Sequence, residues 1–491
     1  MNRQQLTPIF TRLKDHIQTQ PVPFHIPGHK NGTGMDKEFR EFIGSNILNM
    51  DLINIEPLDD LHHPSGVIDE AQKLAAEAFG ADYTFFSVQG TSGAIMTMIL
   101  SVCAPGDKIL VPRNVHKSIM NAIIFSGAVP IFMYPALDED FGISHGITPL
   151  TAQHALERHP DAKALLVINP TYFGFSSDLG AIVETAHHYD VPVLVDEAHG
   201  VHIHFHESLP PSAMEAGADM AATSVHKLGG SMTQSSVLNV QGTRVSIAHV
   251  QAVFSMLTTT STSYPLLASL DTARRQLALK GHSLIDDTLE LAEETRDSIN
   301  SINGLYCAGA EMLEQNTVTA MDPTKLLISV QQLGINGYEA EKWLRKHYRI
   351  EVELSDLYNI LCIISFGDTE KEISLLVQAM KELARQHYAP EAYTAPAVLK
   401  LPSIPTLSIA PRDAFYAEKE TVALSESAGR IIAEFIMIYP PGIPVLLPGE
   451  IITQENLTYI QANAAAGLPV QGPEDPSLQT IRVIQEQKPI Q

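Results

Sequence analysis

The sequence predicts an α/β protein whose main sheet is largely parallel and covered by helices on both faces. From about residue 61 to 270, short apolar strands alternate with helical segments, which is typical of right-handed β–α–β crossovers. Their apolar composition suits strands that are buried on both faces. The predicted strands are 84–88 (TFFSV), 108–112 (KILVP), 129–134 (VPIFMY), 164–168 (ALLVI) and 191–198 (VPVLVDEA).

The chain divides into five predicted segments. Residues 1–60 form an arm, because one apolar helical face precedes the turn-rich stretch PVPFHIPGHKNGTG. An arm of this kind has too little core of its own and must pack on another surface. The further segments are a large domain at 61–290, a smaller α/β domain at 291–390, a Pro-rich linker at 391–404 and a C-terminal domain at 405–491.

Composition narrows the classes of partner. The 491 residues are 45% hydrophobic, which is ample for a buried core. With 32 Lys and Arg against 56 Asp and Glu, the net charge is −24, which argues against nucleic acid or an acidic membrane surface and favours a cationic substrate. Three widely spaced cysteines, no signal sequence and no apolar run of about 18 residues predict a cytoplasmic protein.

The strongest chemical signal is the pair Asp196 and Lys227. Asp196 ends a buried strand in VLVDEAHG, where open α/β sheets bind their ligands, and Lys227 lies in a glycine-flanked turn in TSVHKLGG. An amine and a buried carboxylate in these positions suit pyridoxal phosphate, since the amine can bond the aldehyde and the carboxylate can hold the pyridine nitrogen protonated. The alternative is a helix-capping aspartate and a surface lysine.

Two strand-to-helix junctions add to this signal. In SVQGTSGAI, the N–H groups of Gly90, Thr91 and Ser92 begin a helix, which is a seat for phosphate, although an ordinary capped helix start has the same pattern. In PRNVHKSIMNA, His116 lies at a position from which an imidazole can stack on an aromatic ring, and its alternative role is that of a core or helix-capping residue.

These segments carry a family resemblance. In order and spacing, GTSGA, RNVHKS, NPTYFG, DEAHG, SVHK and YPPGIPVLLPGE resemble the Orn/Lys/Arg decarboxylases, which are fold type I pyridoxal-phosphate enzymes. FHIPGHK and DLINIEPLDDLH are similar to the biosynthetic arginine decarboxylases of Gram-positive bacteria within that family. The resemblance implies an aspartate aminotransferase-like large domain with a mainly parallel seven-stranded sheet, a smaller α/β domain and a C-terminal domain.

The resemblance also implies an activity. It is the decarboxylation of L-arginine to agmatine and carbon dioxide, with pyridoxal 5'-phosphate as cofactor, feeding the synthesis of putrescine and spermidine. Lysine and ornithine are the alternative substrates within the family.

Site roles follow from the resemblance residue by residue. Lys227 is the Schiff-base lysine, Asp196 pairs with the pyridine nitrogen, and the adjacent His226 is a candidate proton donor. His116 and Ala198 lie on opposite faces of the ring. The phosphate is held by Thr91, Ser92 and Ser224 beside Gly90. A partner subunit adds a hydroxyl, best matched by Thr259, with Thr258 and Thr260 as the alternatives. A homodimer is then the minimal active unit, and a higher homo-oligomer stays open.

The distal cation of a basic amino acid needs a carboxylate. The candidates are Asp59, Asp60, Glu434 and Glu450, with Glu353 and Asp356 also eligible, and each is alternatively a cap or a solvated charge. Glu434 and Glu450 are slightly favoured because they flank the rigid segment YPPGIP.

Two alternatives of other classes remain. In HGVHIHFHE, an extended backbone would place His202, His204 and His206 on one face, which is a pattern for zinc and a metal-dependent amidohydrolase. No cysteine partner or HExxH motif accompanies it, so we expect no metal. A non-catalytic pyridoxal-phosphate carrier would not need the carboxylate of Asp196.

Overall fold

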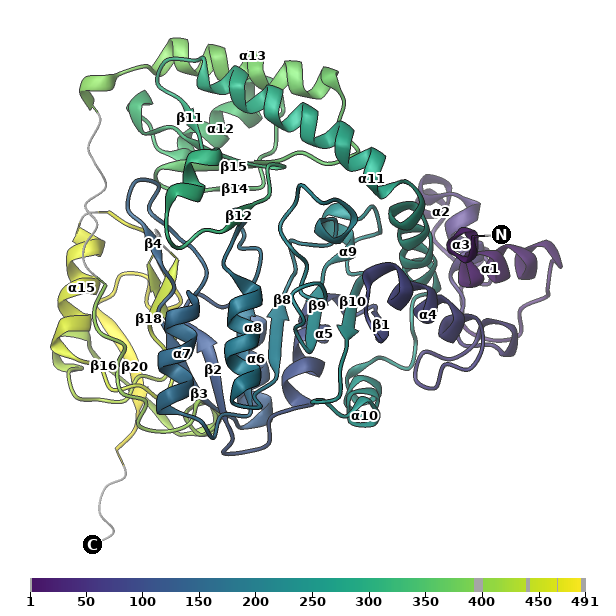
Figure 1. Cartoon of the computed structure of the whole chain (residues 1–491), viewed down its shortest axis with the longest axis horizontal. Coiled ribbons are helices and arrows are strands. Elements are labelled where there is room, and N and C mark those ends of the chain that lie inside the picture. The colour runs from purple at the N-terminus through teal and green to yellow at the C-terminus, as the bar shows by residue number, and fades with distance from the viewer. Residues whose placement is uncertain (1, 393–400, 439–441, 466, 487–491) are drawn as a thin grey trace, which may run out of the picture. The chain divides into compact units, whose positions relative to one another are not determined.

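The computed structural model of the chain describes residues 2–392, 401–438, 442–465 and 467–486 (Figure 1). It contains two compact units, Met1–Val102 with Asp190–Asp286 and Cys103–Tyr189 with Asp287–Gln491. Residues 393–400 of the predicted linker lie outside the described residues, and the domain boundaries stay predictions. In the part of the chain that is described, no helix has the length and apolar character needed to cross a membrane.

The first unit holds four strands of the main sheet in the order β1-β10-β9-β8. Strands β8 and β9 are parallel, whereas β10 is antiparallel to both of its neighbours. In register, Asp196 at the end of β8 pairs with Ala222, so the ends of β8 and β9 lie side by side. The bounds are β1 (Tyr83–Ser87), β8 (Val193–Asp196), β9 (Met220–Thr223) and β10 (Ser236–Val240).

The helices of the first unit follow from capping and apolar periodicity. Helix α4 ends at Gly80 in the left-handed conformation that glycine adopts without strain, and α10 is capped by the side chain of Ser246. The α-helices are α1 (Pro8–Gln18), α2 (Lys37–Ile43), α3 (Ser45–Met50), α4 (Val67–Phe79), α5 (Gly90–Leu100), α9 (Val225–Leu228), α10 (Ile247–Leu257) and α11 (Tyr264–Asn300), and α11 continues into the second unit.

The N-terminal arm is fixed to α11 by a buried ion pair. The carboxylate of Asp271 accepts hydrogen bonds from the N–H groups of Ile9 (3.0 Å) and Phe10 (3.2 Å) at the start of α1. Arg274 lies 2.7 Å from the same carboxylate and donates to the carbonyl of Leu6. As expected, the arm therefore packs on other parts of the chain: it is bound to α11, and α1 also packs on α4.

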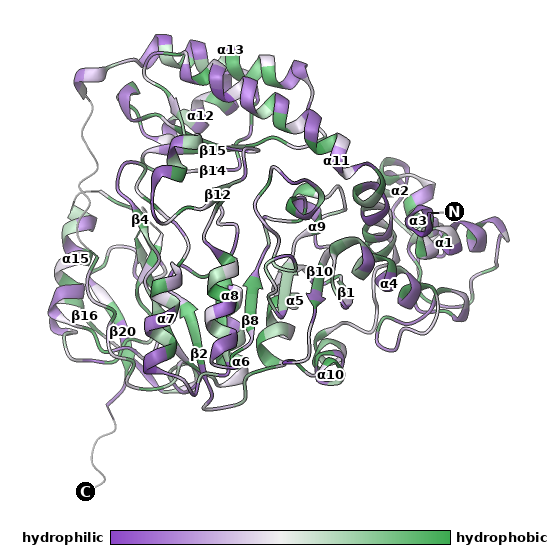
Figure 2. Ribbon diagram, in the orientation of Figure 1, coloured by the Kyte–Doolittle hydropathy of each residue, from purple (hydrophilic) through white to green (hydrophobic). Residues whose placement is uncertain are grey.

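The second unit contributes three parallel strands in the order β6-β2-β3. With the four strands of the first unit they make up the seven strands of a mainly parallel sheet, as the family resemblance implied. Figure 2 shows that β2 and β8 are hydrophobic, whereas α7 carries hydrophilic residues. The elements are β2 (Lys108–Pro112), α6 (Lys117–Ser126), β3 (Val129–Met133), α7 (Pro149–Arg158), β6 (Ala164–Ile168) and α8 (Leu179–His188).

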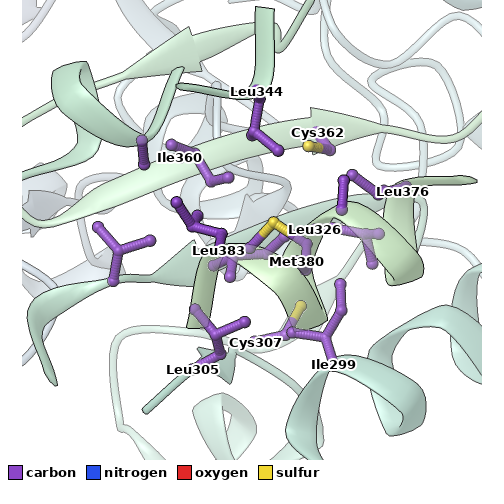
Figure 3. Close-up of a cluster of buried hydrophobic side chains, with 14 of the residues drawn as sticks. Ile299, Leu305, Cys307, Leu326, Leu344, Ile360, Cys362, Leu376, Met380 and Leu383 are labelled. Atoms are coloured by element: carbon purple, nitrogen blue, oxygen red, sulfur yellow. The ribbon is translucent and has the colours of Figure 1, made fainter. Parts of the chain in front are cut away.

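A smaller α/β layer follows in the second unit. Its antiparallel sheet has the order β11-β13-β15-β14 and packs against α12 and α13 around the apolar core in Figure 3. Cys307 and Cys362 lie in this core as free thiols, and burial raises the pKa of each to about 12. The elements are β11 (Tyr306–Cys307), β13 (Lys325–Ser329), α12 (Gly337–Tyr348), β14 (Leu354–Ser355), β15 (Asn359–Ile363) and α13 (Glu370–His387).

The C-terminal part has its own core, which includes Ile436, Leu446 and Ile460. Strand β16 pairs with β20, and β17 lies between β18 and β19. The elements are α14 (Pro411–Tyr416), β16 (Lys419–Ala423), β17 (Ile436–Ile438), β18 (Ile443–Leu446), α15 (Gln454–Ala465), β19 (Val470–Gln471) and β20 (Thr480–Ile484). The remaining short strands of the second unit are β4 (Leu137–Asp138), β5 (Ile143–Ser144), β7 (Phe175–Ser176) and β12 (Ala320–Met321).

Candidate active site

Lys227 lies in the one-turn helix α9, directly after β9. Its side chain is exposed, and its Nζ lies 2.7 Å from Nε2 of His199. Gly229 permits this tight helix end, because a Cβ there would meet the carbonyl oxygen of Val225 at 2.7 Å. The lysine amine is therefore held beside an imidazole and open to a ligand.

Asp196 is the buried carboxylate of the site. It is 5% exposed, and its Oδ1 accepts the N–H of Ala198 at 3.2 Å. Burial raises the pKa of Asp196 to about 6, and this rise is moderated by the Ala198 N–H and by the charge of Lys227. The structure thus brings Asp196 and Lys227 together, and a cationic group placed at Asp196 would stabilise its charged form.

Three hydroxyl groups meet at the start of α5. Thr91 Oγ1 is hydrogen-bonded to the hydroxyl of Ser224 and lies 2.9 Å from Oγ of Ser236. Thr91 is buried, whereas Ser92 in the same helical turn is exposed. This cluster, with the positive end of the helix, is suited to a phosphate group.

The prediction for Gly90 needs a correction. Its N–H donates to the carbonyl of Gln234 at 2.9 Å. This amide is therefore hydrogen-bonded within the chain and does not point outward. Its φ of +68° allows the turn into α5. Of the three predicted amides, only those of Thr91 and Ser92 remain as phosphate donors.

Two site residues were not predicted from the sequence in these roles. Neither His199 nor Ser236 was assigned a role at this site from the sequence. The motif DEAHG was a signal for His199, because it lies three residues after the buried Asp196. No local signal marks Ser236, since β10 places it in the cluster by its pairing with β9 and β1.

His226 and His116 are the two histidines that were predicted to act at this site. The Nδ1–H of His226 donates to the carbonyl of Ser235 at 2.8 Å, which makes Nε2 the unprotonated nitrogen of the neutral ring. His116 belongs to the second unit, where it is the N-cap of α6 and accepts the N–H of Ser118. Its predicted stacking on a cofactor ring stays a prediction, as does the packing of Ala198 on the other face.

The segment around Thr259 is part of the first unit. The carbonyl of Thr259 accepts a hydrogen bond from Nε2 of His62 at 3.1 Å, and its hydroxyl accepts the N–H of Ser261. Thr259 is exposed, whereas Thr258 is buried and bonded to its own helix. Thr259 is thus the more accessible hydroxyl, and its role toward a partner subunit stays a prediction.

Glu450 is not placed to bind substrate. It and Arg113 are fully buried, and its carboxylate accepts a bidentate hydrogen bond from that guanidinium, with Oε2 2.8 Å from Arg113 Nη2. Oε2 also accepts the N–H of Leu447. The prediction for Glu450 was wrong because its charge is already neutralised inside the second unit.

The other five acidic candidates have local partners. Glu353 accepts the hydroxyl of Tyr172, and Asp356 accepts the N–H groups of Tyr358 and Asn359. Asp59 accepts four backbone N–H bonds, from residues 60, 65, 66 and 68, and therefore organises the loop before α4. Asp60 accepts the N–H of His62, and Glu434 accepts the N–H groups of Glu474 and Arg482. Their role toward a substrate stays a prediction.

The histidine-rich segment is not extended. Residues Ile203–Phe205 form a 3-10 helix, so the alternation that would align three imidazoles does not occur. His204 Nδ1 lies 3.1 Å from Ser212 Oγ, whereas His206 Nε2 lies 2.9 Å from Asp286. The zinc set of the amidohydrolase alternative is therefore not formed.

Family models match most of the chain. Residues 7–372 match the major domain of the Orn/Lys/Arg decarboxylases, and residues 396–471 match their C-terminal domain. The chain is 66% identical over 490 residues to the arginine decarboxylase of Halalkalibacterium halodurans, with both proteins covered completely. It is 64% identical to the arginine decarboxylase of Bacillus subtilis, covering 99% of this chain and 100% of that one.

Solved structures show the same fold. Lysine decarboxylase A of Pseudomonas aeruginosa is 26% identical, with a TM-score of 0.82, over 98% of this chain and 81% of that chain. The fold extends to the ureidoglycine-glyoxylate aminotransferase of Bacillus subtilis, with a TM-score of 0.54, 14% identity and coverage of 67% of this chain and 88% of that one. From the matched domains and the full-length identities, the chain belongs to the Orn/Lys/Arg decarboxylase family.

Proposed function

We propose that the protein decarboxylates L-arginine to agmatine and carbon dioxide at the site around Lys227 and Asp196. The identity of 66% and 64% to full-length arginine decarboxylases carries this proposal, since the lysine decarboxylase LdcA of Pseudomonas aeruginosa is only 28% identical. The net charge of −24 also favours a cationic amino acid. The agmatine formed would enter the synthesis of putrescine and spermidine.

The enzyme is pyridoxal-phosphate-dependent, as are the decarboxylases of its family. When bound, the cofactor supplies an electron-poor ring that takes up the electron pair left by the departing carboxyl group. The residues present fit it in three respects: an exposed lysine amine, a buried carboxylate with a raised pKa, and a cluster of hydroxyls at a helix start.

Asp196 is assigned to the ring nitrogen. A cation beside this buried carboxylate restores its charged form, and the carboxylate in turn holds a proton on that nitrogen. Thr91, Ser92 and Ser224 are assigned to the phosphate, and we add Ser236 because its hydroxyl joins the same cluster. Ala198 and His116 are assigned to the two faces of the ring.

The proton on the lysine amine must leave before the amine can act as a nucleophile. Nε2 of His199 lies at hydrogen-bond distance from Lys227 Nζ and is placed to accept that proton. His226, with Nδ1–H fixed on Ser235, presents Nε2 as the atom that can carry a proton to the substrate. We assign His199 to the lysine and His226 to the proton that replaces the carboxyl group.

A homodimer in the cytoplasm is part of the proposal. The arm exposes large apolar side chains, with Phe24 95%, Phe42 89% and Val22 77% exposed. A second copy would cover such a surface, and Thr259 is the hydroxyl that each copy would give to the phosphate of the other. Sedimentation of the purified holoenzyme tests this, and a monomer that is fully active would contradict it.

The substrate is tested with the holoenzyme and L-arginine, L-lysine and L-ornithine at equal concentration. We expect agmatine to form faster than cadaverine or putrescine, with one carbon dioxide per amine. Faster cadaverine or putrescine would contradict arginine specificity and leave the family chemistry intact. Release of urea or ammonia without carbon dioxide would support a hydrolase, and binding of cofactor without turnover would support a carrier.

A further inference from the structure

His62 connects the loop before α4 to the segment between α10 and α11, and all of these parts belong to the first unit. Its Nε2 lies 3.1 Å from the carbonyl oxygen of Thr259, and its Nδ1 lies 2.9 Å from Oγ of Ser255 in α10. A second contact joins the same two segments, because Tyr264 at the start of α11 donates its hydroxyl to the carbonyl of Asp59 at 2.5 Å. The loop before α4 therefore holds the connection between α10 and α11 at both of its ends.

The hydrogen bonds define the orientation of the His62 ring. A carbonyl oxygen can only accept a hydrogen bond, so Nε2 carries the N–H that is directed at Thr259. Nδ1 of the neutral ring then accepts the hydroxyl of Ser255. The backbone N–H of His62 donates to Asp60 at 3.0 Å, and its carbonyl accepts the side-chain amide of Gln251 at 3.3 Å. The main chain and the imidazole of His62 are thus both fixed before any ligand binds.

The hydroxyl of Thr259 can donate to a group outside the chain. Its oxygen accepts the N–H of Ser261 at 3.2 Å, and a hydroxyl that accepts one hydrogen bond still has its own hydrogen to donate. Thr258 differs, because its buried hydroxyl donates to the carbonyl of Phe254 in α10. Thr259 is therefore the one of these two residues that offers a donor at the surface, and an anionic oxygen is the acceptor that binds such a donor most strongly.

We propose that His62 is a positioning residue for Thr259 and fixes the hydroxyl that one subunit gives to the cofactor phosphate of the other. This inference rests on the proposed function, in which Thr259 has that role. The His62 N–H holds the carbonyl of Thr259, and the hydroxyl of the same residue closes the turn to Ser261. Without the imidazole, the phosphate would have to order this turn when it binds, and that ordering costs binding free energy.

The test is a titration of pyridoxal phosphate, and separately of pyridoxal, into the full-length chain after removal of the cofactor. His62→Asn keeps a polar group near the position of Nδ1 but is too short to reach Thr259, whereas the amide of His62→Gln lies near the position of Nε2 and can donate to that carbonyl. We expect His62→Asn to raise the dissociation constant of pyridoxal phosphate about 3- to 10-fold, as for the loss of one hydrogen bond, and to leave that of pyridoxal unchanged. His62→Gln should restore the wild-type affinity. His63→Asn, at the exposed neighbouring histidine, is the matched control and should bind both ligands as the wild type does.

Thr259→Val is the second arm of the test, because valine removes the hydroxyl and keeps the shape of the side chain. It should weaken the binding of pyridoxal phosphate about 10- to 100-fold, and adding His62→Asn to it should cause no further loss. Wild-type affinity in Thr259→Val would overturn the proposed phosphate role of Thr259 and this inference with it. A loss in Thr259→Val without a loss in His62→Asn would overturn the positioning role alone. Equal losses for pyridoxal phosphate and pyridoxal in His62→Asn, or losses that add in the double variant, would show that His62 only supports the fold and would overturn it as well.

Discussion

Nζ of Lys227 and Nε2 of His199 lie 2.7 Å apart, although the two residues follow different strands, β9 and β8. The parallel pairing of these strands places their carboxyl ends at one edge of the sheet. A lysine needs a neutral amine to attack a carbonyl, and this imidazole is the group placed to accept its proton. The contact therefore couples the reactivity of Lys227 to a second titratable residue.

His199→Gln should slow cofactor attachment to Lys227 about 100-fold at neutral pH, because the amide cannot take up the proton. The loss should shrink as the pH rises, since hydroxide then deprotonates the amine. Stopped-flow absorbance of cofactor binding at several pH values measures this, with His249→Gln as a control on a distant helix. An unchanged pH profile would contradict the role of His199.

Lys227→Ala should abolish turnover and the visible absorbance of the lysine-bound cofactor. The wild type as isolated should be yellow, because the amine of Lys227 holds the cofactor covalently. The matched control is Lys280→Ala, which removes another lysine of the first unit, and that variant should stay yellow and active. A colourless wild type that gains no absorbance from added cofactor would overturn the assignment.

Asp196→Asn should keep the cofactor and lose about 100- to 1,000-fold in turnover, because an amide cannot stabilise the charge on the ring nitrogen. Single-turnover kinetics with saturating cofactor separates this loss from weaker binding. A variant of near wild-type rate would show that another carboxylate pairs with the ring.

The same substitution should stabilise the cofactor-free protein. The folded-state pKa of Asp196 is about 6 against an ordinary value of 3.8, so its charged form disfavours folding above pH 6. A pKa difference of about 2 units corresponds to about 3 kcal/mol of unfolding free energy at pH 7. The stability that Asp196→Asn gains should disappear as the pH falls from about 6 to about 4. Urea unfolding of both proteins across this range measures it, and equal stability at pH 7 would contradict the burial of the charge.

Thr91→Ala combined with Ser224→Ala should weaken the binding of pyridoxal phosphate. Hydrogen bonds to a charged group contribute about 1.5–3 kcal/mol each, so the loss of two should raise the dissociation constant at least about 100-fold. Pyridoxal without phosphate is the matched ligand, and its affinity should not change. Equal losses for both ligands would mean that the hydroxyls support the fold rather than the phosphate.

Glu450→Gln should destabilise the fold by about 3–5 kcal/mol, because it leaves the buried guanidinium of Arg113 without its counter-charge. Glu434→Gln, at a partly exposed carboxylate, is the control and should cost far less. Urea unfolding gives both values. A Glu450 variant of normal stability with a raised KM would restore the substrate role that the structure contradicts.

The sequence alone allowed neighbouring site residues to be predicted where they follow the carboxyl ends of parallel strands. Asp196 and Lys227 could be paired from the amino-acid sequence alone, because parallel strands deliver their carboxyl ends to a common edge. Partners far away in the chain could not be found in this way. Arg113 and Glu450 are 337 residues apart, and neither has a local pattern that points to the other.

Local backbone conformation was the second feature that could not be predicted from the sequence. The amide of Gly90 was expected to face a ligand, but it donates to the carbonyl of Gln234. The hydropathy pattern cannot predict which acceptor a backbone N–H binds. The segment from His199 to His206 shows alternating histidines, yet it folds as a turn and a 3-10 helix because the strand β8 has already ended at Asp196. Alternation is informative only where the backbone is extended.

The anchor of the arm has a consequence for synthesis on the ribosome. Ile9 is bound by a carboxylate 262 residues further along the chain. At about 5–20 residues per second, the arm leaves the ribosome on the order of 13–50 s before its anchor is made. During that time α1, with the later buried Ile9 and Leu13, can pack on α4 but has no anchor on α11. The nascent enzyme thus carries an N-terminal arm without its anchor through more than half of its translation, and a chaperone acting at the ribosome could bind this arm before Asp271 is made.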